Sequence, residues 1–288
     1  MNRRSFLSTL GAAAAAGAVL PEIARAGVAG AARKVGPIGL QLYTVRDAMQ
    51  KDVAGTLARV GAIGYKEVEF AGYFNHPATH IREYLGKAGL TSPSVHVPID
   101  TMRTALPQAI ADAKVIGHEW ITMPWLAPEQ RPTTADGWKT LAAEIGKHAA
   151  AVHAAGLKFA YHNHDFEITP VGGVVPLEVL LSSTDPAHVD FEMDVYWVTK
   201  AGSDPLAWFA KHPGRFRMLH IKDASPAPAR DMRPVGQGTI NWRAVLADRP
   251  KAGTRHIFVE HDSAAEWGQG DAFKSVAASY KYLSTLAV

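Results

Sequence analysis

The sequence of 288 residues predicts a single (β/α)8 barrel, an α/β fold, on three observations. Short apolar runs bounded by turn residues indicate buried strands, and they alternate with amphipathic stretches that indicate helices. Several of these stretches end at a glycine, which readily adopts the left-handed conformation that ends a helix. No change in composition marks a linker between two domains. A closed barrel of parallel strands fits this size and this alternation.

The apolar runs give the positions of eight strands. They lie near residues 37–43, 66–70, 93–97, 119–124, 157–163, 188–194, 216–221 and 255–260. The clearest amphipathic helices lie at 138–155 and 271–284. Glycines at the helix ends recur every 25 to 39 residues, as expected of repeated helix–strand units. They are Gly64, Gly89, Gly117 and Gly156.

The competing fold is an open, doubly wound sheet. Such a sheet would require a glycine-rich phosphate loop after its first strand. The residues at that place are Gln41-Leu42-Tyr43-Thr44-Val45-Arg46, which contain no glycine. The sequence therefore favours the barrel.

Composition and charge exclude several classes of function. The formal net charge is +3, and removal of residues 1–26 would leave about +1, so the chain lacks the basic excess of a nucleic-acid-binding protein. It contains no cysteine, which excludes disulfides, thiolate ligands, a thiol nucleophile and a lipoprotein anchor. Any metal ion must therefore be bound by nitrogen and oxygen atoms.

The first 26 residues resemble a twin-arginine export signal. Arg3-Arg4 precedes an apolar stretch that runs to Leu20, and Ala24-Arg25-Ala26 has the form of a cleavage site. The apolar stretch is shorter than the ~20 residues of a membrane-spanning helix. We predict a signal peptide over 1–26, a barrel domain over 27–288 and a periplasmic location. The alternatives are a basic disordered tail and an uncleaved anchor.

Metal-ligand residues end four consecutive predicted strands. His162, Asp194, His220 and Glu260 end the fifth to the eighth. The carboxyl ends of barrel strands open onto one face, so these four side chains should converge. One such residue alone would more often be a hydrogen-bonded core residue or a helix cap, but four together indicate a site. Two imidazoles and two carboxylates suit Mn²⁺, Co²⁺, Fe²⁺ or Zn²⁺ better than Mg²⁺ or Ca²⁺. We predict one divalent metal ion.

Six further side chains are expected at the same rim as substrate contacts. They are Glu69, His96, Trp125, Trp197, Lys222 and Asp223. The two tryptophans can stack on the apolar face of a sugar ring, with ordinary packing as the alternative. For Lys222 and Asp223, which directly follow a predicted ligand, the alternative is a surface ion pair. For His96 it is a structural hydrogen bond.

Beyond residue 26, the chain resembles the xylose isomerase-like TIM barrels, or sugar phosphate isomerase/epimerase superfamily. Four segments carry the resemblance. They are 38–47, Tyr161-His162-Asn163-His164-Asp165-Phe166, His220-Ile221-Lys222-Asp223 and Val235-Gly236-Gln237-Gly238-Thr239-Ile240. The family binds its metal through Glu, Asp, His and Glu, so the resemblance implies Asp194, His220 and Glu260 as ligands. His162 stands where many epimerases have the first Glu.

The resemblance implies a metal-dependent enzyme that acts on a sugar or keto-sugar. With His162 in place of an anionic ligand, the Lewis acidity of the ion toward a carbonyl oxygen should rise. Glu260 is the candidate base, and His164 is its acid or base partner. We expect an isomerase or epimerase that works through an enediolate. A lyase, dehydratase or hydrolase acting on 3-keto-glycosides or inosose-like polyols is nearly as well supported.

Two readings from other classes remain. An exported carbohydrate-binding barrel could keep the metal without turnover, although pure binding would not need Glu260 and His164. An apurinic-site endonuclease would need additional His and Glu ligands and a basic groove. The expected partner is a small sugar or polyol, with no nucleic acid and no stable membrane span. The oligomeric state stays open, with a homodimer as one option.

Overall fold

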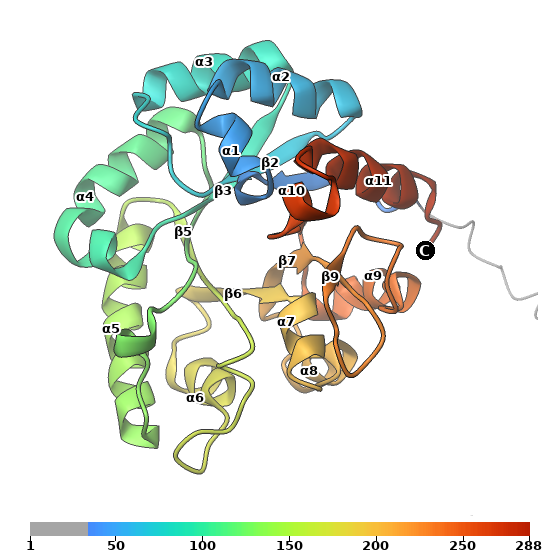
Figure 1. The fold of residues 1–288 in the computed structure, drawn as a ribbon. Helices are drawn as coiled ribbons and strands as arrows, with labels where there is room; N and C mark the ends of the chain where they lie inside the picture. The colour runs from blue at the N-terminus through green and yellow to red at the C-terminus, as the bar shows by residue number, and fades with distance from the viewer. Residues whose placement is uncertain (1–33) are drawn as a thin grey trace, which may run out of the picture. The chain divides into compact units, whose positions relative to one another are not determined.

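Eight parallel strands close into a barrel in this protein, seen in a computed structural model that describes residues 34–288 (Figure 1). The strands are β1 (Gly39–Gln41), β2 (Glu67–Phe70), β3 (Thr91–His96), β4 (Trp120–Met123), β5 (Lys158–His162), β6 (Val189–Asp194), β7 (Phe216–Ile221) and β10 (His256–Val259). Their order around the barrel is β1-β10-β7-β6-β5-β4-β3-β2. The predicted barrel is confirmed. The predicted signal over 1–26 lies outside the described residues.

Seven of the eight barrel strands lie within their predicted ranges, and β3 begins two residues earlier than predicted. The prediction began the strand at Pro93, whereas the observed strand includes Thr91 and Ser92 before it. A proline has no N–H to donate to a neighbouring strand, so it is unusual inside a strand. The register between β2 and β3 shifts between Glu67 and Glu69, and this irregularity accommodates the proline inside the strand.

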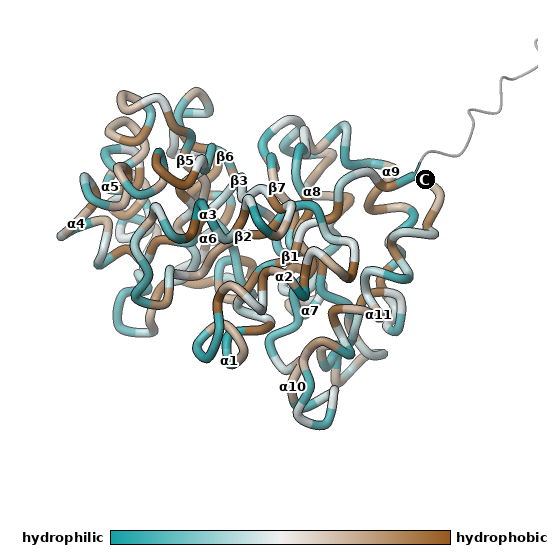
Figure 2. Tube along the Cα trace, turned by 90° about the horizontal axis from the view of Figure 1, so that it is seen from above, coloured by the Kyte–Doolittle hydropathy of each residue, from teal (hydrophilic) through white to brown (hydrophobic). Residues whose placement is uncertain are grey.

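Helices surround the strands (Figure 1). The longer ones are α2 (Val53–Ile63), α3 (Ala78–Ala88), α4 (Ile99–Ile116), α5 (Ala135–Ala154), α6 (Pro176–Ser183), α7 (Val195–Lys200), α8 (Pro205–Lys211), α9 (Trp242–Ala252) and α11 (Ala272–Thr285). Short turns occur at η1 (Leu42–Val45), α1 (Arg46–Met49), η2 (Pro128–Gln130) and α10 (Ala264–Trp267). Brown and teal alternate along α4 and α5 in Figure 2, as expected of helices with one apolar side.

The two helices predicted most clearly are α5 and α11, and side-chain caps set their starts. Thr134 accepts a hydrogen bond from the N–H of Gly137, so α5 begins three residues earlier than predicted. Asp271 caps α11 in the same way. Helix α3 ends at Gly89, whose φ of 64° confirms the predicted role of glycine there. Among residues 34–288, no helix is both long and apolar enough to cross a membrane.

The barrel interior is apolar at one level and polar at the next, and this change positions the site. One buried cluster consists of Trp120, Ala160, Met218 and Phe258. Side chains alternate between the faces of a strand, so the residue two positions later faces the interior again. Those residues are Thr122, His162, His220 and Glu260, all buried. The polar level therefore lies at the carboxyl ends of the strands.

Candidate active site

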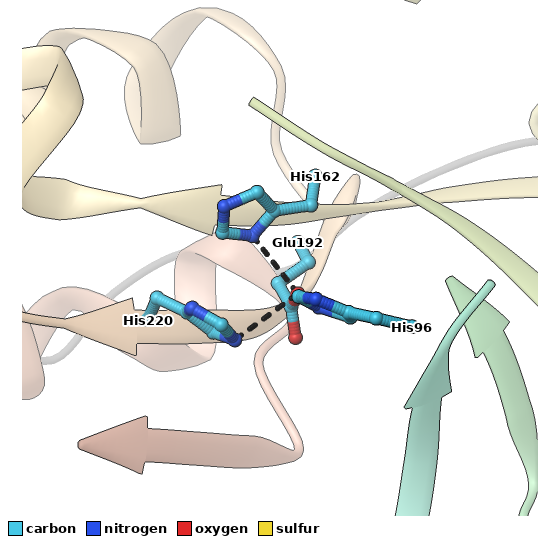
Figure 3. Close-up of side chains that lie close together, drawn as sticks. All are labelled: His96, His162, Glu192 and His220. Carbon is cyan, nitrogen blue, oxygen red and sulfur yellow. Dashed lines mark hydrogen bonds and ion pairs between the residues drawn. The ribbon is translucent and has the colours of Figure 1, made fainter. Parts of the chain in front are cut away.

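Glu192, on β6, is at the centre of the polar level. Its Oε2 atom lies 2.9 Å from His96 Nε2, 3.0 Å from His162 Nδ1 and 3.2 Å from His220 Nε2. The three imidazoles come from β3, β5 and β7 and surround the carboxylate (Figure 3). These four residues form one group that could hold a metal ion. Glu192 is fully buried, and its Oε1 atom makes no hydrogen bond within residues 34–288.

Glu69, on β2, completes this inner group from the opposite side of the barrel. Its Oε2 atom lies 2.6 Å from His220 Nε2 and 3.1 Å from His96 Nε2, and it accepts a 2.8 Å hydrogen bond from Gln41 Nε2. The sequence predicted that Glu69 contacts substrate at the rim. The structure corrects this position: the side chain is fully buried and does not line the pocket, because it faces the barrel interior below the rim.

A second group lies toward the rim and contains three of the four predicted metal ligands. The ligand atoms of Asp194, His220 and Glu260 lie within 4.8 Å of one another. In this outer group, His220 Nδ1 is 2.7 Å from Glu260 Oε2. The fourth predicted ligand, His162, places its Nε2 atom 3.8 Å from Asp194 Oδ2. The structure thus brings all four residues together, with His162 at the edge of the group.

His162 and His220 each direct one nitrogen to each group. Carboxylates accept hydrogen bonds, so Glu192 and Glu69 keep a proton on the inner nitrogens, His162 Nδ1 and His220 Nε2. The outer nitrogens are then the atoms that can donate a lone pair to an ion. Together with Asp194 and Glu260, they make a nitrogen–oxygen donor set that fits a divalent transition ion.

The two imidazoles differ in protonation. Burial lowers the pKa of His220, but the carboxylates of Glu192, Glu260 and Glu69 outweigh it and hold this pKa well above its ordinary value. Burial, assisted by the positive charge of His220, holds the pKa of His162 well below its ordinary value. His220 is therefore the protonated ring, and an ion bound at the outer group would replace its second proton.

Lys222 is a buried cation within the outer group. Its Nζ atom lies 2.7 Å from Glu260 Oε2, 3.0 Å from Asp194 Oδ2 and 3.1 Å from Asp262 Oδ1. Burial lowers the pKa of Lys222, but the three carboxylates raise it well above its ordinary value. The predicted substrate contact lines the pocket, and its charge is matched by these acidic neighbours.

His164 packs against two aromatic rings on the wall of the pocket. The ring of Phe166 stacks on it with ring centres 5.9 Å apart, and the ring of Trp197 lies tilted to it with ring centres 5.5 Å apart. Its buried Nδ1 atom has no hydrogen-bond partner within the described chain. Burial, followed by the charge of Lys222, lowers the pKa of His164 well below its ordinary value. The ring is therefore neutral near pH 7, and it lines the pocket.

A pocket of about 680 Å³ opens above these groups. Of the predicted site residues, it is lined by His96, Trp125, His162, His164, Trp197, Lys222 and Glu260. Asp194 and His220 are fully buried and lie outside the lining. The volume lies within the range of roughly 300–1,000 Å³ that small-molecule sites occupy.

Asp223 is not part of this pocket, which corrects its predicted place. It lies in a short hairpin of β8 (Asp223–Ala224) and β9 (Met232–Arg233) that the sequence did not predict. Its carboxylate accepts four hydrogen bonds, from the N–H groups of Ala224, Gly236 and Ile240 and from the indole of Trp242. Asp223 therefore fixes the loop that follows β7.

Glu192 is the main site residue that sequence analysis missed. The signal was present, because Asp190, Glu192 and Asp194 alternate along β6 and should share one face. Because the prediction considered only residues at strand ends, it identified Asp194 and not Glu192 as a site residue of this strand. Three further residues that line the pocket were also missed: Tyr43, Arg131 and Asp262. They lie in the segments that follow β1, β4 and β10. In such segments no sequence pattern distinguishes a pocket residue from a surface residue.

The chain is similar in sequence to known proteins. The sequence model of the xylose isomerase-like TIM barrel family matches residues 57–278. An inosose dehydratase of Lacticaseibacillus casei is 29% identical over 90 residues, which cover 31% of this chain and 30% of that protein. The matched stretch therefore spans less than a third of the length of this curated relative.

Solved structures resemble the chain over most of its length. The sugar phosphate isomerase/epimerase of Parabacteroides distasonis superposes with a TM-score of 0.76 at 26% identity, over 87% of this chain and 98% of that one. The IOLI protein, solved with a bound zinc atom, gives a TM-score of 0.69 at 15% identity, over 85% of this chain and 95% of that one. At 15% identity, the similarity to the IOLI protein shows a shared fold.

Proposed function

The chain belongs to the xylose isomerase-like TIM barrel family, and from this premise we propose that it is a metal-dependent lyase acting on a keto-sugar or keto-polyol. The reaction would remove the proton next to the ketone and expel an oxygen substituent from the following carbon. Water is the leaving group when that substituent is a hydroxyl.

The place of His164 in the pocket carries the proposal. Its imidazole lies on the wall of the pocket that Glu260 and Lys222 also line. The ring is neutral, and its Nδ1 atom has no hydrogen-bond partner within residues 34–288 that would fix its proton. A neutral imidazole can accept a proton and return it, as a general base and then a general acid.

One residue can serve both proton transfers. His164 accepts the proton from carbon while the C–H electron pair moves toward the ketone oxygen. When those electrons return to form the carbon–carbon double bond, the C–O bond breaks and the leaving oxygen takes the proton from His164. A bound divalent ion would stabilise the negative charge that develops on the ketone oxygen. The donor set for that ion is His162, Asp194, His220 and Glu260.

Glu260 was the base predicted from sequence, and its contacts favour His164 for this step. Burial raises the pKa of Glu260, but Lys222 and His220 outweigh it and hold the pKa well below its ordinary value. Its Oε2 atom is also already engaged, at 2.7 Å from both Lys222 Nζ and His220 Nδ1. We assign Glu260 to holding the ion and orienting the substrate oxygen.

The comparisons support a lyase without fixing the substrate. The curated relatives include inosose dehydratases, whose name describes loss of water from a keto-polyol. An isomerase or epimerase is the second candidate, favoured by the similarity to the Parabacteroides distasonis structure. Both reactions begin with the same proton transfer and differ in whether the proton returns to carbon or passes to an oxygen.

Proton NMR in D₂O on the metal-loaded protein distinguishes these reactions. The panel contains ketoses, inososes and 3-keto-glycosides. Loss of water or of an alcohol would support the lyase. Deuterium incorporation beside the ketone without net loss would instead identify the isomerase or epimerase. If none of these compounds reacts although metal and sugar are bound, the result would favour a carbohydrate-binding barrel.

Two variants test the assigned roles in the same assay. His164→Asn should lower turnover by at least about 100-fold, the usual contribution of a general acid–base group, with little change in sugar affinity. Glu260→Gln should lower both turnover and metal content. Full turnover in His164→Asn would contradict the proposed proton transfer.

A further inference from the structure

We propose that the mouth of the pocket is a second subsite, which holds a ring attached to the reacting sugar. The substrate is then a glycoside, and the reacting ring lies at the polar floor. The inference rests on the proposed function, since it names the class of keto-sugar that this site accepts.

The size of the pocket is the first observation. Its volume of about 680 Å³ is within the range of sites for drug-sized ligands, which are larger than one sugar ring. The groups assigned to chemistry are gathered at the buried end. His162 and Lys222 are 2% exposed and Glu260 is 6% exposed. A single ring in contact with them would leave the outer part of the pocket to solvent.

Exposed aromatic side chains at the mouth are the second observation. Three large hydrophobic side chains are exposed in residues 34–288: Tyr43 at 44%, Trp125 at 44% and Val115 at 39%. Two of the three, Tyr43 and Trp125, line this pocket. Exposed apolar groups collected at one cavity are typical of a ligand site.

The strand order places Tyr43 and Trp125 at separate points of the pocket mouth. Tyr43 follows β1 and Trp125 follows β4, and β2 and β3 lie between these strands around the barrel. The lining residues that follow β2 and β3 are Ala71, Gly72 and Pro98, all of them small. Tyr43 and Trp125 therefore border one part of the mouth, called the slot, with these small residues between them.

An arginine lies against each of these two aromatic rings. The guanidinium of Arg46 lies 4.3 Å from the ring centre of Tyr43, and that of Arg131 lies 5.4 Å from the ring centre of Trp125. A cation over the face of an aromatic ring is attracted to it and restricts its motion. Aromatic rings held in this way offer a large contact area at little cost in conformational entropy.

The charges of the pocket favour a neutral second ring. Of the three cations that line it, Lys222 is matched by three carboxylates, and His96 is matched by Glu69 and Glu192. Arg131 packs on Phe166 at 3.8 Å, and its Nε donates a hydrogen bond to the carbonyl of Leu126. A phosphate would find no cluster of free cations among the pocket-lining residues. The apolar face of a phenyl group or of a second pyranose fits the slot.

Calorimetric titration with unreactive glycosides tests the subsite without requiring turnover. The ligands are methyl β-D-glucoside, phenyl β-D-glucoside and methyl β-cellobioside. At least one ligand with a second ring should bind the protein about tenfold more tightly than the methyl glucoside, equivalent to about 1.4 kcal/mol. The ligand that gains affinity tells whether an aromatic group or a second sugar occupies the slot.

Variants separate the subsite from general packing. Trp125→Ala and Tyr43→Ala should remove the tenfold preference while methyl glucoside affinity stays unchanged, and Trp125→Phe should retain most of it. Val115→Ala changes an exposed apolar side chain on α4 that does not line the pocket, and it should alter neither affinity. Equal affinity for all three ligands, or equal losses for them in Trp125→Ala, would overturn the subsite.

The outcome is independent of the test of the lyase. A tenfold preference with no turnover of any keto-sugar would support the subsite and refute the lyase. Turnover of keto-sugars with no preference for a second ring would refute the subsite alone.

Discussion

Glu192 accepts hydrogen bonds from imidazoles whose other nitrogens face the outer group. Its contact at 3.0 Å keeps a proton on His162 Nδ1, and together with the nearer Glu69 it keeps a proton on His220 Nε2. A carboxylate that fixes the tautomer of a ligand histidine also raises its basicity. Glu192 is therefore a positioning residue for the proposed metal site.

Replacement of Glu192 by Gln tests this role at the residue scale. The amide keeps the shape but can donate a hydrogen bond, so it no longer enforces protonation of His162 Nδ1, whereas Glu69 still binds His220 Nε2. The affinity for Zn²⁺ or Co²⁺, measured calorimetrically, should fall by about 10- to 100-fold. Asp190→Asn is the control, because Asp190 lies on the same face of β6 and binds Trp120 and Arg217 instead. Equal affinities in the wild type and Glu192→Gln would refute the positioning role.

Among the connecting elements, the loop after β7 depends on one carboxylate. Asp223 accepts hydrogen bonds from three backbone N–H groups and one indole. A Cβ atom at Gly238 would collide with this carboxylate and with the carbonyl of Ala224, so the loop requires glycine there. The segment 235–240, which carries part of the family resemblance, thus packs around Asp223.

Truncation of Asp223 should therefore destabilise the protein. Asp223→Ala would leave the indole of Trp242 and the N–H groups of the loop without their acceptor, and we expect a loss of about 3 kcal/mol in the free energy of unfolding by urea. Asp231→Ala is the control, since its side chain is 62% exposed and contacts Arg233 at 3.9 Å. That control should change stability by less than about 0.5 kcal/mol. Similar effects of the two substitutions would show that Asp223 does not organise the loop.

Much of the barrel could be predicted, because buried strands and amphipathic helices have recognisable periods. The positions of His162, His220 and Glu260 followed from the meeting of parallel strand ends. Glu192 required counting by two along β6, and the position of Asp223 depended on the direction of the chain after β7. A hairpin with strands of two residues has no period to detect. Loop direction is set by tertiary contacts, which the local sequence does not display.

At the scale of the whole molecule, His118 joins three segments of the barrel through hydrogen bonds to residues on β3 and after β2. It precedes β4, and its Nδ1 lies 2.7 Å from the carbonyl of Ser92 while its Nε2 lies 3.1 Å from the hydroxyl of Tyr73. The carbonyl can only accept, so Nδ1 carries the proton and Nε2 accepts from the tyrosine. Burial lowers the pKa of His118 to about 4, which keeps it neutral in the folded protein.

This pKa predicts a loss of stability in acid. Below about pH 6.5 the unfolded chain takes up a proton at His118 that the folded protein cannot accept until about pH 4. Stability should therefore fall as the pH decreases through this window, with a contribution of about 3 kcal/mol from this residue. Urea unfolding at pH 7 and pH 4.5 measures the fall, and His118→Asn should show a correspondingly smaller one. An equal fall in both proteins would contradict the assignment.

The ammonium of Lys222 bears on the order in which the enzyme is assembled. It already compensates the acidic side chains at the pocket floor, so closing the barrel does not leave these charges unbalanced. The barrel can then fold completely before it binds the metal ion. Under the proposed function, the supply of metal in the surroundings, rather than the yield of folding, would set how many molecules are active.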